Sequence, residues 1–270
     1  MDGIKFMRLN HFYNEDCFNT MDNMIKEDFQ VDAILTSPPY NTARVGNSYM
    51  TQKARDNGYG RYDIYSEFET NQEYIDWTID LFHKFNKIVR ENGVVIYNLS
   101  YGAENTEVMW RTVYNILEDT PFTIADNIIW KKDNALPSPA SPNRLTRICE
   151  YIYIFVRENE MDTFHTNKQI SKVGNNGQTY YHTIDNFIEA PNNDGANKLN
   201  KATYSTELCR KLLNIYVKPQ SIVYDPFMGT GTTANACKLE NINYIGSELS
   251  NAQVEYSKKR LNYNTLDQYV

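Results

Sequence analysis

Nearly continuous apolar runs alternate along this chain with segments in which apolar residues recur every three or four positions. Continuous short runs are typical of strands buried on both faces, and the second spacing is typical of amphipathic helices. The expected strands occupy a short segment from residue 12 and residues 31–35, 94–99, 128–130, 151–156, 221–227 and 243–248. The expected helices occupy residues 17–25, 73–89, 104–117, 205–216 and a segment ending at residue 239. This order predicts a doubly wound, mostly parallel α/β sheet.

Two polar stretches interrupt the pattern. Residues 42–63 are rich in Gly, Asn, Ser, Arg and Tyr, and so long a loop is uncommon in a compact domain unless it is functional or disordered. Its cations and rings suit the backbone and bases of a nucleic acid, although a solvated loop explains them equally well. Residues 157–202 are also polar, and we interpret them as a small inserted recognition region.

The strand that begins at Val31 ends abruptly at Ser37, in front of two prolines that cannot continue a strand ladder. Proline fixes φ and lacks an N–H, so the Ser37 hydroxyl and the nearby carbonyls are held as acceptors in fixed geometry. Tyr40 follows as a flat ring. Acceptors beside an aromatic face, at the carboxyl end of a parallel strand, suit a planar base that carries an exocyclic amino group. A stiff turn would explain this segment alone equally well.

A second candidate site lies near the carboxyl terminus. The strand at residues 221–227 runs directly into a turn containing Gly229 and Gly231, and a helix follows. Glycines permit close backbone approach, and a helix N-terminus offers free N–H groups to a nucleotide-like cofactor. Glu248 ends the next strand, about where dinucleotide folds place the acidic residue that binds ribose hydroxyls. The alternative is an ordinary turn of a βαβ unit.

Composition narrows the function classes. The charged fraction of 23% and the hydrophobic fraction of 41% are those of an ordinary soluble globule, and no apolar run has the length of a membrane span. We therefore expect an intracellular protein. The net charge of −7 argues against a surface that binds nucleic acid everywhere, but it allows one basic cleft. The four cysteines lack C-x-x-C spacing and the four histidines are dispersed, so neither a disulfide framework nor a metal site is expected.

With residues 36–40 and 227–231 both in view, the chain resembles the beta arrangement of the amino-methyltransferases of DNA, in which the catalytic tetrapeptide precedes the cofactor loop. The resemblance covers nearly the whole chain, includes residues 129–132, and is weakest between residues 157 and 202. It implies a seven-stranded Rossmann-like methyltransferase sheet with a small target-recognition insertion. The implied boundaries are a catalytic half at residues 1–156, the insertion at 157–202 and a cofactor-binding half at 203–270.

The resemblance also implies a methyl donor, S-adenosylmethionine, and a role for each matching residue. The implied catalytic residues are Ser37, Pro38, Pro39 and Tyr40. The implied cofactor-binding residues are Asp16, Thr36, Asp225, Pro226, Phe227, Gly229, Thr230, Gly231, Thr232 and Glu248. The basic residues that we expect to meet double-stranded DNA are Arg44, Lys53, Arg55, Arg61, Lys131, Arg144 and Arg147. Residues 201–205 replace a stretch that usually contains His-Pro, which puts the cofactor contacts of that segment in question.

Position 37 bears on the target base. Family members with Ser there are mostly cytosine-N4 enzymes, and those with Asp are mostly adenine-N6 enzymes. The continuation into Asn41 is also familiar from adenine enzymes. We therefore expect methylation of cytosine N4, with adenine N6 as the alternative.

Three rival classes differ in chain order or in their residues. A protein-glutamine methyltransferase would place the cofactor loop before the tetrapeptide. A catalytically inactive nucleic-acid-binding partner subunit would be expected to lose one of the two sites, and this chain has both. A Rossmann oxidoreductase would carry a third glycine. The resemblance further raises the cytoplasm of a bacterial or viral host cell as the location, and a homodimer and a cognate restriction endonuclease as partners, none of which the sequence tests.

Overall fold

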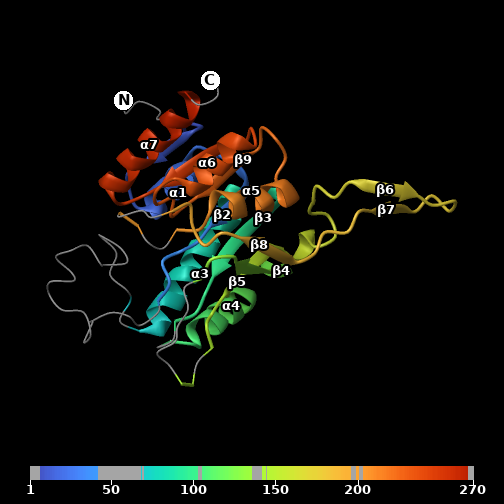
Figure 1. Ribbon diagram of the computed structural model, residues 1–270, viewed down its shortest axis with the longest axis horizontal. Helices are drawn as coiled ribbons and strands as arrows, with labels where there is room; N and C mark the ends of the chain where they lie inside the picture. The colour runs from blue at the N-terminus through green and yellow to red at the C-terminus, as the bar shows by residue number, and fades with distance from the viewer. Residues whose placement is uncertain are drawn as a thin grey trace.

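The computed structural model describes residues 7–41, 68, 70–102, 105–135, 142–143, 145–195, 199–200 and 203–266. Its main feature is an eight-stranded sheet with helices on both faces (Figure 1). The strands of this sheet are β1 (His11–Tyr13), β2 (Val31–Thr36), β3 (Val89–Leu99), β4 (Phe122–Lys132), β5 (Cys149–Arg157), β8 (Phe187–Ala190), β9 (Ile222–Asp225) and β10 (Asn243–Ser247). The α-helices of the described residues are α1 (Cys17–Lys26), α3 (Asn71–Ile88), α4 (Val108–Asp119), α5 (Thr206–Tyr216), α6 (Thr232–Leu239) and α7 (Asn251–Leu266).

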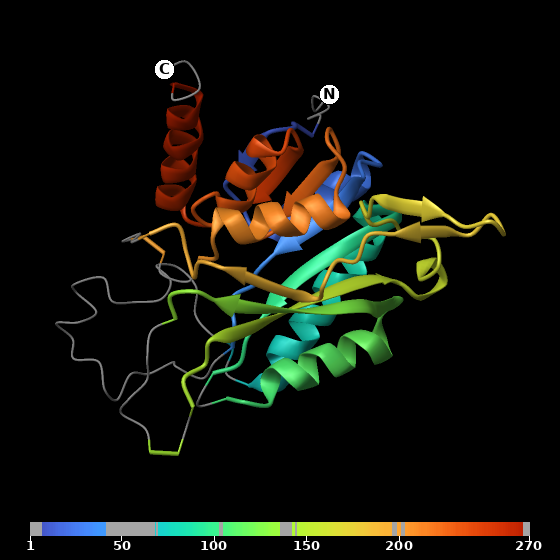
Figure 2. The same cartoon turned by 45° about the vertical axis from the view of Figure 1, so that its right-hand side comes forward.

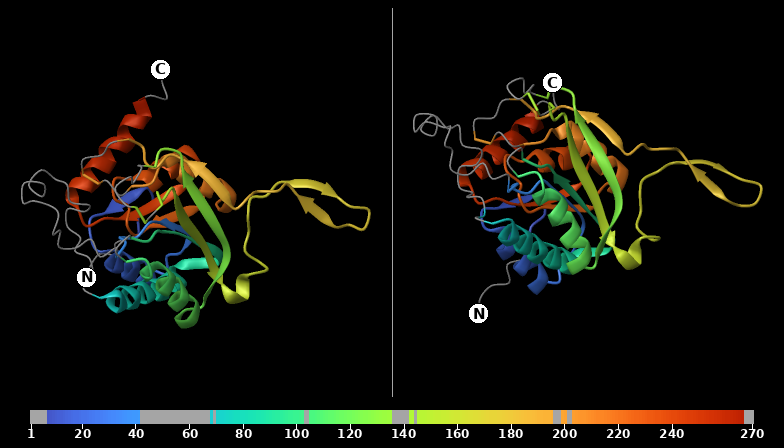
Figure 3. Two further views of the ribbon diagram at one scale, coloured as in Figure 1. Left: turned by 60° about the horizontal axis from the view of Figure 1, so that its bottom comes forward. Right: turned by 90° about the horizontal axis from the view of Figure 1, so that it is seen from below.

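The core has two halves, one on each face of the sheet. Helices α1, α3 and α4 pack on one face, and α5, α6 and α7 pack on the other (Figures 2 and 3). Successive side chains of a strand point to opposite faces, so Val94 and Ile96 of β3 join the half under α5 and α6, while Val95 and Tyr97 join the half under α3 and α4. Because both faces are covered, the central strands contain nearly continuous apolar runs, as expected.

The order of the strands is β1-β10-β9-β2-β3-β5-β4-β8. The first five of these are parallel to one another, whereas β5 is antiparallel to both of its neighbours, β3 and β4. The direction of winding reverses between β2 and β9, where Ala33 pairs with Val223 and Ile34 pairs with Tyr224. The crevice outside the carboxyl ends of two such strands is the usual binding site of open α/β sheets. The predicted doubly wound, mostly parallel sheet is confirmed.

The strand count and one boundary differ from expectation. Residues 187–190, which we expected inside the insertion, form β8 and pair with β4 as an eighth strand. Residues 90–93, which lie between the expected helix and the expected strand, instead form an irregular part of β3, which begins at Val89. A Cβ atom on Gly93 would lie 2.7 Å from the Asp32 carbonyl oxygen, so glycine allows β3 to pass close to β2. The glycine therefore marks a close approach of two strands and not a chain reversal.

Residues 170–181 form a separate antiparallel hairpin, of β6 (Ile170–Val173) and β7 (Thr179–Tyr181), which projects from the body of the protein (Figure 1). A short 3-10 helix, Glu158–Glu160, precedes it. The hairpin leaves the sheet after the end of β5 and returns at the start of β8. Because β5 is antiparallel to β3, this is the amino-terminal end of the parallel strands. The β6–β7 hairpin therefore lies at the opposite end of the sheet from the crevice.

Candidate active site

The two segments singled out in the sequence meet at the point where the winding reverses. Thr36 ends β2 and Asp225 ends β9, and the Thr36 hydroxyl donates a hydrogen bond of 2.6 Å to Asp225 Oδ1. Both side chains are buried. The candidate acceptor segment, residues 37–40, and the glycine turn, residues 226–231, therefore begin side by side.

A pocket opens above this junction. Its lining comes from the chain that follows β1, β2, β9 and β10, from helix α3 and Phe68 ahead of it, and from Asn200, Thr203 and Tyr204 ahead of α5. The lining residues are Glu15, Asp16, Cys17, Ser37, Pro39, Phe68, Trp77, Asn200, Thr203, Tyr204, Pro226, Phe227, Met228, Gly229, Thr230, Thr232, Glu248, Leu249 and Gln253. Most of the residues that the sequence assigned to a cofactor thus face one pocket together with Ser37.

The glycine turn forms the floor of the pocket. Gly229 and Gly231 have φ angles of +55° and +78°, the left-handed region that favours glycine. Gly231 is the N-cap of α6, so the free N–H groups of that helix lie at the turn. The Gly229 N–H donates a hydrogen bond of 2.9 Å to Glu248 Oε2, and the Ser250 N–H donates one of 2.8 Å to Oε1. Both oxygens of the Glu248 carboxylate are therefore fixed at the pocket wall.

Asp225 lies beneath this turn and does not line the pocket. Its carboxylate accepts hydrogen bonds from the hydroxyls of Thr36, Tyr204 and Thr233 and from the Phe227 N–H. Complete burial raises its pKa, and these hydrogen bonds oppose the shift. Thr36 and Gly231 are likewise part of the support of the pocket and not of its lining.

Asp16 serves two purposes. Its Oδ1 accepts a hydrogen bond of 2.8 Å from the Phe18 N–H, which makes it the N-cap of α1. Its side chain also lines the pocket. Its role as the N-cap of α1 is therefore compatible with a position in the pocket wall.

In the acceptor segment, residues 37–40, Ser37 is partly exposed and the other three residues are buried. Ser37 lines the pocket, and its Oγ lies 2.9 Å from the hydroxyl oxygen of Tyr40. Tyr40 itself is only 6% exposed, and Pro38 is also buried. Stacking of Tyr40 on a base therefore stays a prediction, because its ring must first be uncovered.

The sequence did not point to Asn98 or Glu150, which contact the Tyr40 hydroxyl from β3 and β5. It also did not point to Trp77, and it left the contacts of the segment around Tyr204 open; both residues line the pocket. Asn98 is the penultimate residue of an apolar strand, and a polar side chain at the carboxyl end of a parallel strand was an available signal. For Glu150, no local signal distinguished it from a surface carboxylate.

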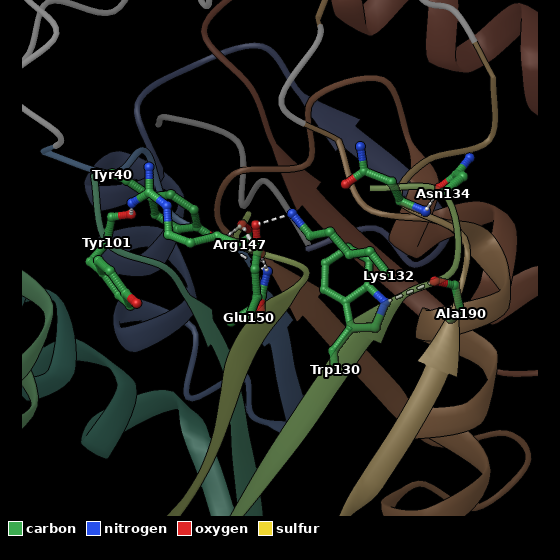
Figure 4. Close-up of polar contacts among 11 residues, drawn as sticks. Tyr40, Tyr101, Trp130, Lys132, Asn134, Arg147, Glu150 and Ala190 are labelled. Carbon is green, nitrogen blue, oxygen red and sulfur yellow. Dashed lines mark hydrogen bonds and ion pairs between the residues drawn. The ribbon is translucent and has the colours of Figure 1, made fainter. Parts of the chain in front are cut away.

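The candidate DNA contacts are only partly described. Lys131 is exposed and pairs with Glu189 on β8. Arg147 donates a hydrogen bond of 2.6 Å to the Tyr101 carbonyl, and its guanidinium lies 5.2 Å from the centre of the Tyr101 ring (Figure 4). Both cations lie at the carboxyl end of β3, the end that carries the pocket. The others, Arg44, Lys53, Arg55, Arg61 and Arg144, fall outside the described residues.

Other chemistries find little support in the part of the chain that the structure describes. Those residues contain no group of three or more His, Cys, Asp or Glu side chains that could hold a metal ion. Burial raises the pKa of the Cys17, Cys209 and Cys237 thiols, so these groups are poor nucleophiles. Among the same residues, no helix combines the length and the apolarity needed to cross a bilayer.

Comparison with known proteins gives matches over most of the chain. A family model described as DNA methylase matches residues 31–259. The orphan methyltransferase M.BamHII of Bacillus amyloliquefaciens is 25% identical over 267 residues, which cover 87% of this chain and 89% of that protein. The crystal structure of M1.HpyAVI aligns with a TM-score of 0.62 at 23% identity and covers 93% of this chain and 98% of its own. The PvuII DNA methyltransferase, described as cytosine-N4-specific, aligns with a TM-score of 0.63 at 17% identity and covers 92% of this chain and 84% of its own.

Proposed function

The chain belongs to the DNA methylase family, and on this premise we propose that it transfers a methyl group from S-adenosylmethionine to the exocyclic amino group of a base flipped out of double-stranded DNA. The observation that carries the proposal is the pairing of β2 with β9. This pairing brings Ser37 and Gly229 to the same pocket, although 192 positions separate them in the sequence (229 − 37).

The pocket residues fit S-adenosylmethionine. The left-handed glycines let the main chain approach a bound molecule, and a Cβ atom on Gly229 would lie 3.2 Å from Asn200 Nδ2. Glu248 would hold the ribose hydroxyls, and Asp16 would approach the adenine amino group. Phe227 and Trp77, whose ring centres lie 5.5 Å apart, supply an apolar wall. When bound, the cofactor supplies a methyl group on a sulfonium, which departs as a neutral sulfide.

The protein's part in the transfer is mainly to position the amine. The Ser37 hydroxyl and the Pro38 carbonyl would accept the two amino hydrogens and so draw the nitrogen toward a pyramidal geometry, with its lone pair facing the methyl group. Because the methyl group would come from a cationic sulfonium, little acid or base chemistry is needed before transfer. The methylated nitrogen then releases one of its two hydrogens as a proton to solvent. In-line positioning of this kind can supply roughly 7–11 kcal/mol. Extrusion of the base from the duplex would cost a few kcal/mol.

We propose cytosine N4 as the target atom, with adenine N6 as the alternative. Ser37 supports cytosine, since Ser at this position is typical of the cytosine-N4 enzymes that the segment resembles. Both bases present the same amino group, so the geometry of Ser37 alone accommodates either one.

The test is methyl transfer by the purified chain. Tritiated S-adenosylmethionine is offered with duplex DNA, RNA or protein, and we expect label in the duplex DNA. Digestion of that DNA to nucleosides and mass spectrometry should then identify N4-methylcytosine. N6-methyladenine would instead establish the alternative base, and label in RNA or protein alone would overturn the proposal.

Replacement of Ser37 by Ala tests the assigned chemistry. We expect Ser37→Ala to lower turnover by roughly 10- to 100-fold, because one acceptor of the amine is lost. Cofactor affinity, measured by calorimetry, should remain within about twofold of the wild type, since the other lining residues are unchanged. Turnover at the wild-type rate would show that Ser37 has no part in the transfer.

A further inference from the structure

We propose that Glu150 is a positioning residue that sets the direction of the hydrogen bonds at Ser37, so that the Ser37 hydroxyl presents lone pairs and not its hydrogen to the substrate amine. The inference rests on the proposed function, because it concerns the same amine. It assigns a role to the largely buried ion pair of Lys132 and Glu150, which the cofactor and base contacts do not use.

Glu150 connects two segments of the site. It is the second residue of β5, and its side chain is 12% exposed. Lys132 Nζ, at the end of β4, lies 2.5 Å from Glu150 Oε1, and this ammonium is only 5.0 Å from the centre of the Trp130 ring (Figure 4). The other carboxylate oxygen, Oε2, faces the acceptor segment. It accepts a hydrogen bond of 2.9 Å from Asn98 Nδ2 and one of 3.3 Å from the Tyr40 hydroxyl.

The Tyr40 hydroxyl is the link to Ser37. Asn98 Nδ2 donates a hydrogen bond of 2.9 Å to the Tyr40 oxygen, and Ser37 Oγ lies 2.9 Å from the same oxygen. By distance alone, either hydroxyl could donate in the contact between Ser37 and Tyr40. The direction of this hydrogen bond must therefore be set by the next hydrogen-bond partner of Tyr40.

Glu150 removes this ambiguity. A carboxylate paired with an ammonium has no hydrogen to give, so the contact between Tyr40 and Glu150 requires the Tyr40 hydrogen to point at Oε2. The Tyr40 oxygen is then the acceptor for the Ser37 hydrogen. With that hydrogen directed away, the lone pairs of Ser37 Oγ face the pocket, where an amino group can donate to them.

The opposite direction would impair the reaction. If Tyr40 donated to Ser37, the Ser37 hydrogen would be released toward the pocket, and two donors, the hydroxyl and the amine, would face each other. Replacement of Glu150 by Gln produces this arrangement. Lys132 would retain the amide oxygen, so the amide NH₂ would face Tyr40 as a donor and force the Tyr40 hydrogen toward Ser37.

The first measurement is turnover of Glu150→Gln on duplex DNA. We expect a fall of roughly 10- to 100-fold in kcat. The affinity for S-adenosylmethionine and the fluorescence of 2-aminopurine placed at the target position should both stay within about twofold of the wild type, because they report binding and base flipping and not transfer. Wild-type kcat in Glu150→Gln would overturn the inference, as would a loss explained entirely by weaker binding of cofactor or DNA.

The second measurement shows whether Glu150 sets the direction of the hydrogen bonds or only supports the local structure. Adding Lys132→Met to Glu150→Gln removes the ammonium that holds the amide oxygen of the new side chain at position 150. The amide can then turn its oxygen toward Asn98 and Tyr40, which restores the original direction of the Tyr40 and Ser37 hydrogens. We therefore expect the double variant to turn over faster than Glu150→Gln alone. A purely structural role predicts a further loss, so a double variant at or below the rate of the single variant would overturn the inference. The double variant leaves no unpaired ammonium at Lys132, so it should fold even if Glu150→Gln alone does not. In that case its kcat is compared with that of the wild type: we expect a similar rate, and a fall of about 10-fold or more would overturn the inference.

The chain offers a matched control at the far end of β5. Glu160 is also buried and pairs with Arg157 at 3.0 Å, but it lies at the end of the sheet opposite the pocket. Glu160→Gln should lower thermal stability about as much as Glu150→Gln does, but it should leave kcat unchanged. If wild-type protein does not methylate DNA, the proposed function fails; if it does and Glu150→Gln matches it, only the inference fails.

Discussion

Asp225 joins the two functional segments through hydrogen bonds from four different groups. Thr36 belongs to β2, Thr233 belongs to α6, and Tyr204 precedes α5, while the Phe227 N–H belongs to the glycine turn. All of these donors converge on one buried carboxylate. A buried donor that loses its acceptor has no water to replace it, so the identity of this one residue controls how closely the acceptor segment and the cofactor turn are held.

Replacement of Asp225 by Ala should lower the free energy of unfolding by about 2–4 kcal/mol, because several buried donors lose their acceptor together. Urea unfolding measures this change, and calorimetry should show weaker binding of S-adenosylmethionine. Asp225→Asn, which keeps the shape and one acceptor oxygen, is the control and should lose less. Equal losses in the two variants would show that the cavity, and not the hydrogen bonds, causes the effect.

The same residue gives a pH dependence of stability. Burial raises the pKa of Asp225 above its ordinary value of 3.8, so the folded protein binds this proton more tightly than the unfolded chain. The contribution of Asp225 to the free energy of unfolding should therefore decrease as the pH rises from 3.8 through the raised pKa, and become constant above it. The difference between wild type and Asp225→Asn, measured by urea unfolding across this range, isolates the contribution. A difference that grows in favour of the wild type with rising pH would contradict the assignment.

Individual residues of the site differ in how far the sequence reveals them. Ser37, Gly229 and Glu248 could be predicted because turn chemistry and strand ends are local properties, and all three line the pocket. Glu150 could not be predicted, since its relevance depends on a hydrogen bond to Tyr40 across 110 positions of the chain. No property of a single segment carries that information.

At the level of elements, the existence of most strands of the main sheet was easier to predict than their ends. The apolar centre of β4 was expected at residues 128–130, but the strand extends from Phe122 to Lys132. Most of its remaining positions are only partly buried, and they include the polar residues Thr123, Asp126 and Asn127. The strand therefore continues through positions that lack an apolar pattern. Pairing with β5 along its whole length compensates for this weak pattern.

Gly93 makes the irregularity in β3 testable. A Cβ atom there would lie 2.6 Å from Val89 Cγ1 and 2.7 Å from the Asp32 carbonyl, so Gly93→Ala should lower the free energy of unfolding by about 1–3 kcal/mol through overpacking. Chemical unfolding provides the measurement. Gly177→Ala in the β6–β7 hairpin is a useful comparison, because its φ is +80° but nothing lies within 4 Å of the added atom. A Gly93→Ala variant as stable as the wild type would mean that β2 and β3 separate without cost.

On the scale of the whole molecule, the hairpin and the pocket occupy opposite ends of the sheet. The nine residues of β5 span about 26 Å at roughly 3.3 Å per residue, with Glu150 near one end and the hairpin beyond the other. The hairpin exposes Ile170, Val173 and Tyr181, and a two-stranded ribbon alone is marginally stable in water. The polar composition of residues 157–202 predicted an insertion but could not indicate the end of the sheet at which these residues leave it.

Replacement of residues 170–181 by a short Gly-Ser linker should leave the protein folded and its methylation of DNA within about twofold of the wild type, because these residues lie far from the pocket. The linker can be short, since the His182 N–H donates a hydrogen bond of 2.9 Å to the Gln169 carbonyl at the base of the hairpin. Circular dichroism and turnover check the two parts of the prediction. Loss of turnover in a folded deletion variant would instead place the hairpin in contact with DNA.

The pairing of β1 with β10 has a consequence for the synthesis of the chain. β1 lies at the edge of the sheet and has β10 as its neighbour, and the Asn14 side chain donates hydrogen bonds to the carbonyls of Glu248 and Leu249. During translation, Asp16 leaves the ribosome long before Glu248. The pocket wall that contains Asp16 is therefore synthesised well before the wall that contains Glu248. A nascent chain that stops before residue 243 would contain Ser37 and the glycine turn but would lack the part of the pocket wall that Glu248, Leu249 and Gln253 supply.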